Sequence, residues 1–119
     1  MKIIFTADTH FGSAFRGENT SVRNGELISA FRSMCRYALD GGAKAVLMGG
    51  DIFDTPYPSH ELQASFISVL KEFEVLKFIM IAGNHDPLYE CAVYSHLPAN
   101  AYVFPAELTA YEFDGLRIY

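Results

Sequence analysis

The chain carries three short continuous apolar runs, at residues 2–7, 44–48 and 77–82. An apolar run without alternating polar residues is typical of a strand covered on both faces in a parallel sheet. Between the runs, apolar residues recur at helical spacing over residues 21–40 and over 59–73. Ser59 is expected to be the N-cap of the second helix. Alternating strands and helices predict an α/β protein with a parallel βαβαβ core and right-handed crossovers.

The last third of the chain predicts shorter elements, namely a helical turn over 89–96 and short strands over 102–104, 109–113 and 116–119. An Asp114-Gly115 turn joins the last two strands into a C-terminal hairpin. The second arm of this hairpin coincides with the end of the sequence. We therefore expect residues 1–119 to be the N-terminal portion of a single domain that is cut short.

Composition narrows the class of protein. The chain has 119 residues, half of them hydrophobic, which is enough for one domain with a real core. No apolar run is long enough to span a bilayer and no secretory signal begins the chain, so we expect a cytoplasmic protein without a membrane partner. Cys35 and Cys91 fit no CxxC pattern, and we expect reduced thiols, with Cys35 on the buried side of its helix.

Polar clusters follow each of the three apolar runs, at residues 7–10, 49–54 and 83–86. The carboxyl ends of parallel strands meet at one edge of a sheet, which is where ligands bind in such folds. We also expect Asp8 and His10 to point the same way, since side chains two apart in extended backbone do so. Taken singly, Asp, Asn and Gly after a strand make ordinary turns and caps. Three clusters with two histidines favour a common site.

Asp and His side chains with open positions suit first-row divalent metals, so Mn²⁺, Fe or Zn²⁺ are expected before Ca²⁺ or Mg²⁺. We expect Asp8 and His10 to hold one metal ion and Asn84 to hold a second. The two oxygens of Asp51 would bridge the pair at the ~3.5 to 4 Å separation used in two-metal hydrolysis.

Other polar residues have supporting roles in this hypothesis. His85 would protonate a leaving oxygen or stabilise charge on a phosphoryl group. Asp54 and Asp86 would lie behind the ligands and orient them or His85. Arg16 could reach a substrate phosphate, although an arginine in an exposed loop is more often only solvated. The net charge of −5 argues against a broadly basic surface that coats nucleic acid. It does not exclude a nuclease, because carboxylates loaded with divalent cations become electropositive.

The chain resembles the calcineurin-like metallophosphoesterases through three motifs in this order: Asp8-x-His10, Gly50-Asp51-x-x-Asp54 and Gly83-Asn84-His85-Asp86. The resemblance implies the first half of a four-layer α/β/β/α sandwich, a dinuclear centre and hydrolysis of phosphoesters. Members of this family add histidine ligands from a second half, and neither of those motifs is present in these residues. The second metal position is therefore expected to be incomplete, or empty, in this chain.

Within the family, the chain most resembles the bacterial DNA repair exonucleases of the SbcD type, through residues 12–15, 50–54, Pro56, Pro58 and 84–87. That resemblance implies nucleic acid as substrate and a coiled-coil ATPase of the SMC type as partner. One alternative is a small-molecule phosphatase or cyclic-nucleotide phosphodiesterase. Another is an inactive half-domain that self-associates, because a sheet face without its cover would expose apolar residues.

Overall fold

The structure is a computed structural model that describes residues 1–13 and 20–119. Its elements, in chain order, are β1 (Lys2–Thr6), α1 (Thr20–Asp40), β2 (Ala43–Gly49), α2 (His60–Glu72), β3 (Lys77–Ile81), the 3₁₀ helix η1 (Ala92–Ser95), β4 (Ala101–Val103), β5 (Tyr111–Phe113) and β6 (Leu116–Ile118). Each helix and strand expected from the sequence is present, with ends that differ by at most three residues.

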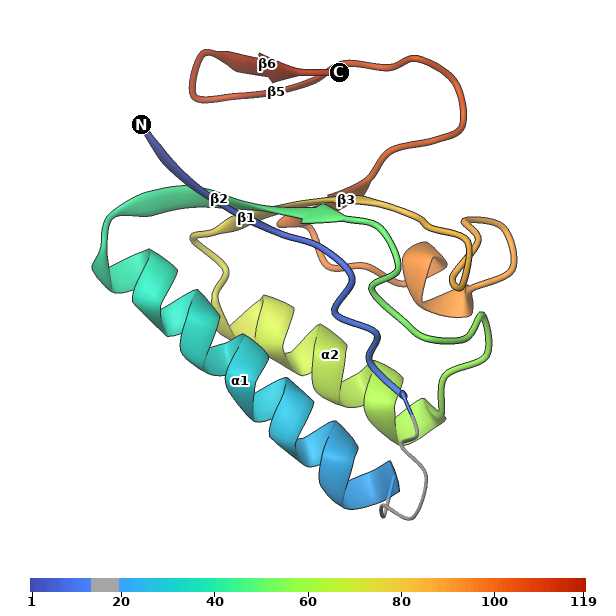
Figure 1. Cartoon of the computed structure of the whole chain (residues 1–119). Helices are drawn as coiled ribbons and strands as arrows, with labels where there is room; N and C mark the ends of the chain where they lie inside the picture. Colours follow the sequence, from blue (N-terminus) through green and yellow to red (C-terminus); the bar gives the residue numbers. More distant parts are fainter. Residues whose placement is uncertain (14–19) are drawn as a thin grey trace.

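Strands β1 to β4 form one parallel sheet in the order β1-β2-β3-β4, and β5 pairs with β6 in a separate antiparallel hairpin. The expected α/β class, with a parallel core and a C-terminal hairpin, is confirmed. Each strand lies beside its successor in the chain, so right-handed crossovers place α1 and α2 on the same face of the sheet. Figure 1 shows both helices below the sheet and the hairpin above it.

The helix-covered face holds the main hydrophobic core. Helix α1 buries Ile28, Phe31, Cys35 and Ala38, at the three- and four-residue spacing of one helical face. Helix α2 begins at the N-cap Ser59, whose hydroxyl accepts a hydrogen bond of 3.2 Å from the backbone N–H of Leu62. Both cysteines are buried and free of a disulfide, and Cys35 lies on the buried side of α1 as expected. Within the described ranges, no helix combines the length and hydrophobicity needed to cross a bilayer.

The opposite face of the sheet packs against the hairpin. Ala45 and Ile79 project from the sheet into a smaller cluster with Phe113 of β5, which is 9% exposed. The rings of Tyr102 and Tyr111 stack across the gap with centroids 4.6 Å apart. The hairpin therefore forms a third layer over part of this face.

Candidate metal centre

The loops after β1 and β2 continue side by side beyond the strand ends. Backbone hydrogen bonds join them at four points: Asp8 N to Gly50 O (3.1 Å), His10 N to Asp51 O (3.0 Å), Phe11 N to Ile52 O (2.8 Å) and Asp54 N to Phe11 O (2.9 Å). These bonds satisfy backbone groups that would otherwise be left without partners at the edge of the sheet. They bring the first two polar clusters of the sequence into direct contact.

Two phenylalanines fix these loops to the helices. Phe11 and Phe53 are at most 1% exposed and both pack against Phe66 of α2, with ring centroids 5.8 and 5.1 Å apart respectively. Phe31 of α1 lies 5.5 Å from Phe11 in an edge arrangement. The polar loops thus rest on a rigid aromatic cluster, which limits how far their side chains can move.

Three residues of these loops have left-handed backbone conformations that non-glycine residues rarely adopt. The φ angles are 53° at Asp8, 49° at His10 and 45° at Asp51. Such a conformation costs roughly 1–2 kcal/mol per residue and concentrates at functional sites. The backbone is therefore not extended here, contrary to the expected geometry. The side chains converge nonetheless: one ligand atom from each of the three residues lies within 4.8 Å of the others.

His10 is held in a defined orientation by Asp54. Its Nδ1 lies 3.0 Å from Asp54 Oδ1, and both side chains are about one-third exposed. A hydrogen bond through Nδ1 leaves Nε2 as the nitrogen that can coordinate a cation, an arrangement common behind metal-ligating histidines. The donor set of two carboxylates and one imidazole, with a carboxylate behind the imidazole, fits a divalent transition metal.

The third cluster reaches the same place from β3. Gly83 lies so close to Asp51 that a Cβ at this position would be 2.2 Å from Asp51 Oδ1 and 2.4 Å from Asp51 N. Glycine is therefore required by close approach of two backbones rather than by a turn. Two residues further on, the backbone N–H of His85 donates to Asp51 Oδ1 at 2.9 Å.

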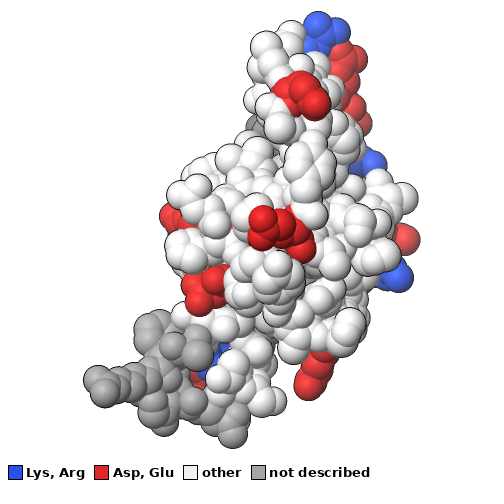
Figure 2. Space-filling model, turned by 90° about the vertical axis from the view of Figure 1, so that its right-hand side faces the viewer, with Lys and Arg blue, Asp and Glu red and all other residues white. Residues whose placement is uncertain are grey.

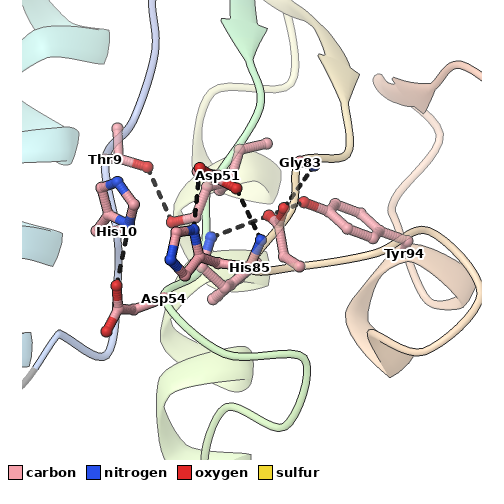
Figure 3. Close-up of polar contacts among 10 residues, drawn as sticks. Thr9, His10, Asp51, Asp54, Gly83, His85 and Tyr94 are labelled. Carbon is pink, nitrogen blue, oxygen red and sulfur yellow. Dashed lines mark hydrogen bonds and ion pairs between the residues drawn. The ribbon is translucent and has the colours of Figure 1, made fainter.

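The His85 side chain also faces Asp51, with Nδ1 3.0 Å from Oδ2 (Figure 3). The backbone hydrogen bond from His85 is the main cause of a lowered pKa at Asp51. In turn, the side-chain hydrogen bond to Asp51 is the main cause of a raised pKa at His85. The two imidazole rings, of His10 and His85, meet edge to face with centroids 5.2 Å apart. Asp51 therefore lies at the centre of the site.

Two further predicted residues, Asn84 and Asp86, belong to the loop after β3. Asn84 is exposed between Gly83 and His85. Asp86 is fully buried and accepts hydrogen bonds from the backbone N–H groups of Gly83 (2.7 Å) and Phe53 (3.0 Å). It therefore contacts the loops that carry the ligands. Arg16 lies outside the described residues.

Two residues of the site have no counterpart in the sequence-based hypothesis. The hydroxyl of Thr9 donates to Ile52 O at 2.9 Å and adds a side-chain link between the first two loops. The hydroxyl of Tyr94, in η1, donates to Asp86 Oδ2. Thr9 occupies the unspecified position of the Asp8-x-His10 motif, and a tyrosine eight positions after Asp86 carries no sequence signal of this contact.

An open depression of about 340 Å³ borders the site and is lined by Asp8, Thr9, His10, Ser13, Arg23, Leu27 and Asp54. The carboxyl ends of the strands point toward the right-hand side of Figure 1, the side that faces the viewer in Figure 2. On that face, acidic side chains lie both near the centre and at the margins, and basic ones lie toward the margins. A broadly basic surface is not seen on this face of the described chain.

Sequence comparison gives one family and several relatives. The family described as Calcineurin-like phosphoesterase matches residues 1–117. DNA double-strand break repair protein Mre11 of Methanosarcina mazei is 34% identical over 88 residues, which cover 72% of this chain and 14% of that protein. A subunit of the nuclease SbcCD from Bacillus subtilis is 29% identical over 89 residues, covering 72% of this chain and 22% of that protein. The chain thus spans less than a quarter of either relative.

Comparison of structures agrees on the fold. Pseudomonas putida nuclease MPE superimposes with a TM-score of 0.57 at 18% sequence identity, over 86% of this chain and 46% of that one. At this identity the likeness concerns the fold alone.

Proposed function

The chain belongs to the calcineurin-like phosphoesterase family, and on that premise we propose that the protein is a metal-dependent phosphoester hydrolase that cleaves DNA as an exonuclease. The observation that carries the proposal is the convergence of Asp8, His10 and Asp51. Their ligand atoms lie within 4.8 Å of one another and all three backbones are left-handed. Backbone strain held by a packed scaffold at a cluster of metal-binding side chains is typical of a functional site.

Asp8, His10 and Asp51 would hold the first divalent cation, with Mn²⁺ as the preferred metal. Asn84 and the second oxygen of Asp51 would contribute to a second position. When bound, such a cation lowers the pKa of a water molecule and polarises a phosphoryl oxygen. The task of the chain is to hold the ligands in place. Asp54 fixes His10 through Nδ1, and Gly83 allows the third loop to touch Asp51.

His85 is suited to act on the leaving group. Its side chain is about half exposed and it faces Asp51 through Nδ1, so the other ring nitrogen can reach a phosphoryl oxygen from the open side. An imidazole in this place can donate a proton to the departing oxygen or stabilise its charge.

Nucleic acid is the preferred substrate class because the two curated relatives described above are named as a DNA repair protein and a nuclease. By the same likeness we infer that the full natural protein works with a partner, since one relative is named as a subunit. The partner inferred from the sequence is an ATPase of the coiled-coil SMC type. We also infer that residues 1–119 form the first part of a larger domain, which the 46% coverage of the Pseudomonas putida chain supports.

The test uses the full natural chain loaded with Mn²⁺, with linear duplex DNA, bis-p-nitrophenyl phosphate and mononucleotides as substrates. We expect release of nucleotides from DNA ends. Asp51→Asn should lower turnover by more than the 10- to 100-fold typical of losing an outer partner of a metal ligand. Asp114→Asn, in the exposed turn of the hairpin, is the matched control and should leave turnover unchanged.

Lack of cleavage of both DNA and bis-p-nitrophenyl phosphate by the loaded protein would overturn the proposal. Faster hydrolysis of mononucleotides or cyclic nucleotides than of DNA ends would instead support the small-molecule phosphatase reading.

A further inference from the structure

Asp86 is a buried carboxylate that joins three segments of the chain. It is 0% exposed. Oδ1 accepts the backbone N–H of Gly83 at 2.7 Å, while Oδ2 accepts both the backbone N–H of Phe53 at 3.0 Å and the hydroxyl of Tyr94. Burying a carboxylate is costly unless hydrogen-bond donors replace its lost water. The third of these donors comes from outside the two loops of the site.

The two loops held by Asp86 are those that meet at Asp51. Gly83 precedes the Asn84-His85 pair, and Phe53 follows Asp51 by two residues. The loops touch where Gly83 lies against Asp51 and where the backbone N–H of His85 donates to its carboxylate. Asp86 also joins these two loops, through its hydrogen bonds to the backbone N–H groups of Gly83 and Phe53. A shift of Asp86 would therefore change the distance between Asp51 and the pair that follows Gly83.

Tyr94 is a fixed donor. It is 7% exposed and its ring packs edge to face against Phe53, with centroids 6.4 Å apart. Burial is the main cause of a raised pKa at its hydroxyl, with the hydrogen bond to Asp86 adding to it, so the proton stays on the phenol. Figure 3 shows the Tyr94 hydroxyl pointing toward the site from η1, on the far side of Gly83 from Asp51.

We propose that Tyr94 is a positioning residue of the phosphoesterase site: its hydroxyl orients Asp86, which in turn holds the loop carrying Asn84 and His85 against Asp51. This inference rests on the proposed function and adds a residue that no motif of the chain contains. Tyr94 does not line the depression beside the predicted ligands, and its hydroxyl acts through Asp86.

The proposal predicts an effect confined to one half of the site. Without the hydroxyl, Asp86 Oδ2 keeps the single N–H of Phe53, and the carboxylate loses one of its three donors. Gly83 and the residues after it then lose a fixed anchor. The Asp8–His10 side is tied to Asp51 by backbone bonds of its own and is unaffected. Metal binding at the Asn84 side should weaken while binding at the Asp8 side is retained.

The test compares the full natural protein with its Tyr94→Phe variant, which keeps the ring and removes only the donor. The control is Tyr89→Phe, because Tyr89 is 82% exposed and lies in the same segment. In the presence of a chelator, amide hydrogen exchange should quicken at Gly83 and Phe53 in Tyr94→Phe, while the amides of α2 exchange as in the wild type. With Mn²⁺ alone as the probe, one calorimetric affinity should fall about 10-fold while the other is retained.

Turnover of a phosphodiester should fall by a similar factor, with the change in kcat rather than in KM, because substrate binding is not directly altered. Unchanged exchange at Gly83 and Phe53, or an unchanged Mn²⁺ affinity in Tyr94→Phe, would overturn the proposal. Faster exchange throughout α2 would also overturn it, since that would show a general structural role. If the wild-type protein hydrolyses no phosphoester, the proposed function fails, but exchange and Mn²⁺ affinity still decide the role of Tyr94.

Discussion

Neighbouring residues of β3 have opposite environments: Met80 is 0% exposed and Ile81 is 47% exposed, although both are large and apolar. Met80 points to the face covered by α1 and α2, and Ile81 points to the face on which the hairpin lies. The same difference occurs on β1, where Ile4 packs against the helices and Phe5 is 69% exposed. The helix face is buried at the central strands β2 and β3, whereas the hairpin face is covered only in part.

The open part of the hairpin face is at the carboxyl ends of the strands. Phe5 and Ile81 both lie beside Gly49. A Cβ added at Gly49 would lie 3.0 Å from the ring of Phe5. Ala45 and Ile79, nearer the other end of the strands, are buried under the hairpin. An apolar strip formed by Phe5, Gly49 and Ile81 therefore borders the candidate metal centre. Any element that covers this strip would lie next to Asp51.

The largest difference between the faces should be in stability. Phe66→Ala removes a 0% exposed ring that contacts three other phenylalanines, and we expect a loss of about 3–5 kcal/mol in the free energy of unfolding. Phe113→Ala, on the hairpin face, should cost roughly half as much, because its surroundings can collapse toward the gap. Urea denaturation of both variants measures the difference. Equal losses would show that the hairpin is as much a part of the core as α2.

A smaller contrast comes from adding one methyl group at two glycines. Gly83→Ala places a Cβ 2.2 Å from Asp51 Oδ1 and 2.4 Å from Asp51 N, and we expect a cost of about 1–3 kcal/mol together with loss of Mn²⁺ binding. At Gly49 the nearest atoms to a new Cβ belong to the exposed ring of Phe5 and to Ala7 Cβ, so Gly49→Ala should cost less than about 1 kcal/mol. Thermal unfolding and Mn²⁺ calorimetry report both quantities. A mild Gly83→Ala variant that still binds metal would contradict the close approach seen here.

The open strip should also make the chain associate with itself. Burying exposed apolar side chains contributes roughly 1.5–3 kcal/mol each, so the double substitution Phe5→Ser and Ile81→Thr should weaken association about tenfold or more. Tyr37→Ser, at a 74% exposed position on α1, is the control on the other face and should have no effect. Sedimentation velocity of the chain over a range of concentrations gives the association constants. A wild-type chain that is monomeric at all concentrations would show that the strip does not mediate self-association.

Much of this arrangement could be predicted from the sequence, because its signals are local. The continuous apolar run of β3 indicated a strand with both faces covered, and the polar residues after each strand indicated the edge where the site lies. The left-handed backbone at Asp8 and His10 could not be predicted, since it depends on pairing between two loops. The contact between Asp86 and Tyr94 depends on the path of an irregular segment. The partial cover of the hairpin face depends on where β5 docks, which no periodicity encodes.

The smallest expected effect is the pH dependence of stability that comes from the ion pair of Asp51 and His85, in the loops after β2 and β3. The pKa of Asp51 is lowered from 3.8, so its contribution to stability is present above that pH and is lost as pH falls through the lower folded-state value. The pKa of His85 is raised from 6.5, so its contribution is fully present below that pH and is lost as pH rises through the higher folded-state value. In the presence of a chelator, the pair should therefore stabilise the folded chain most between these two ordinary pKa values.

We expect the thermal midpoint of His85→Gln to lie slightly below that of the wild type at about pH 5.5, and the gap between the two midpoints to close at about pH 9. His60→Gln, at an exposed position at the start of α2, is the matched control. A gap that stays the same up to about pH 9 would mean that His85 acts on stability through packing rather than through its charge.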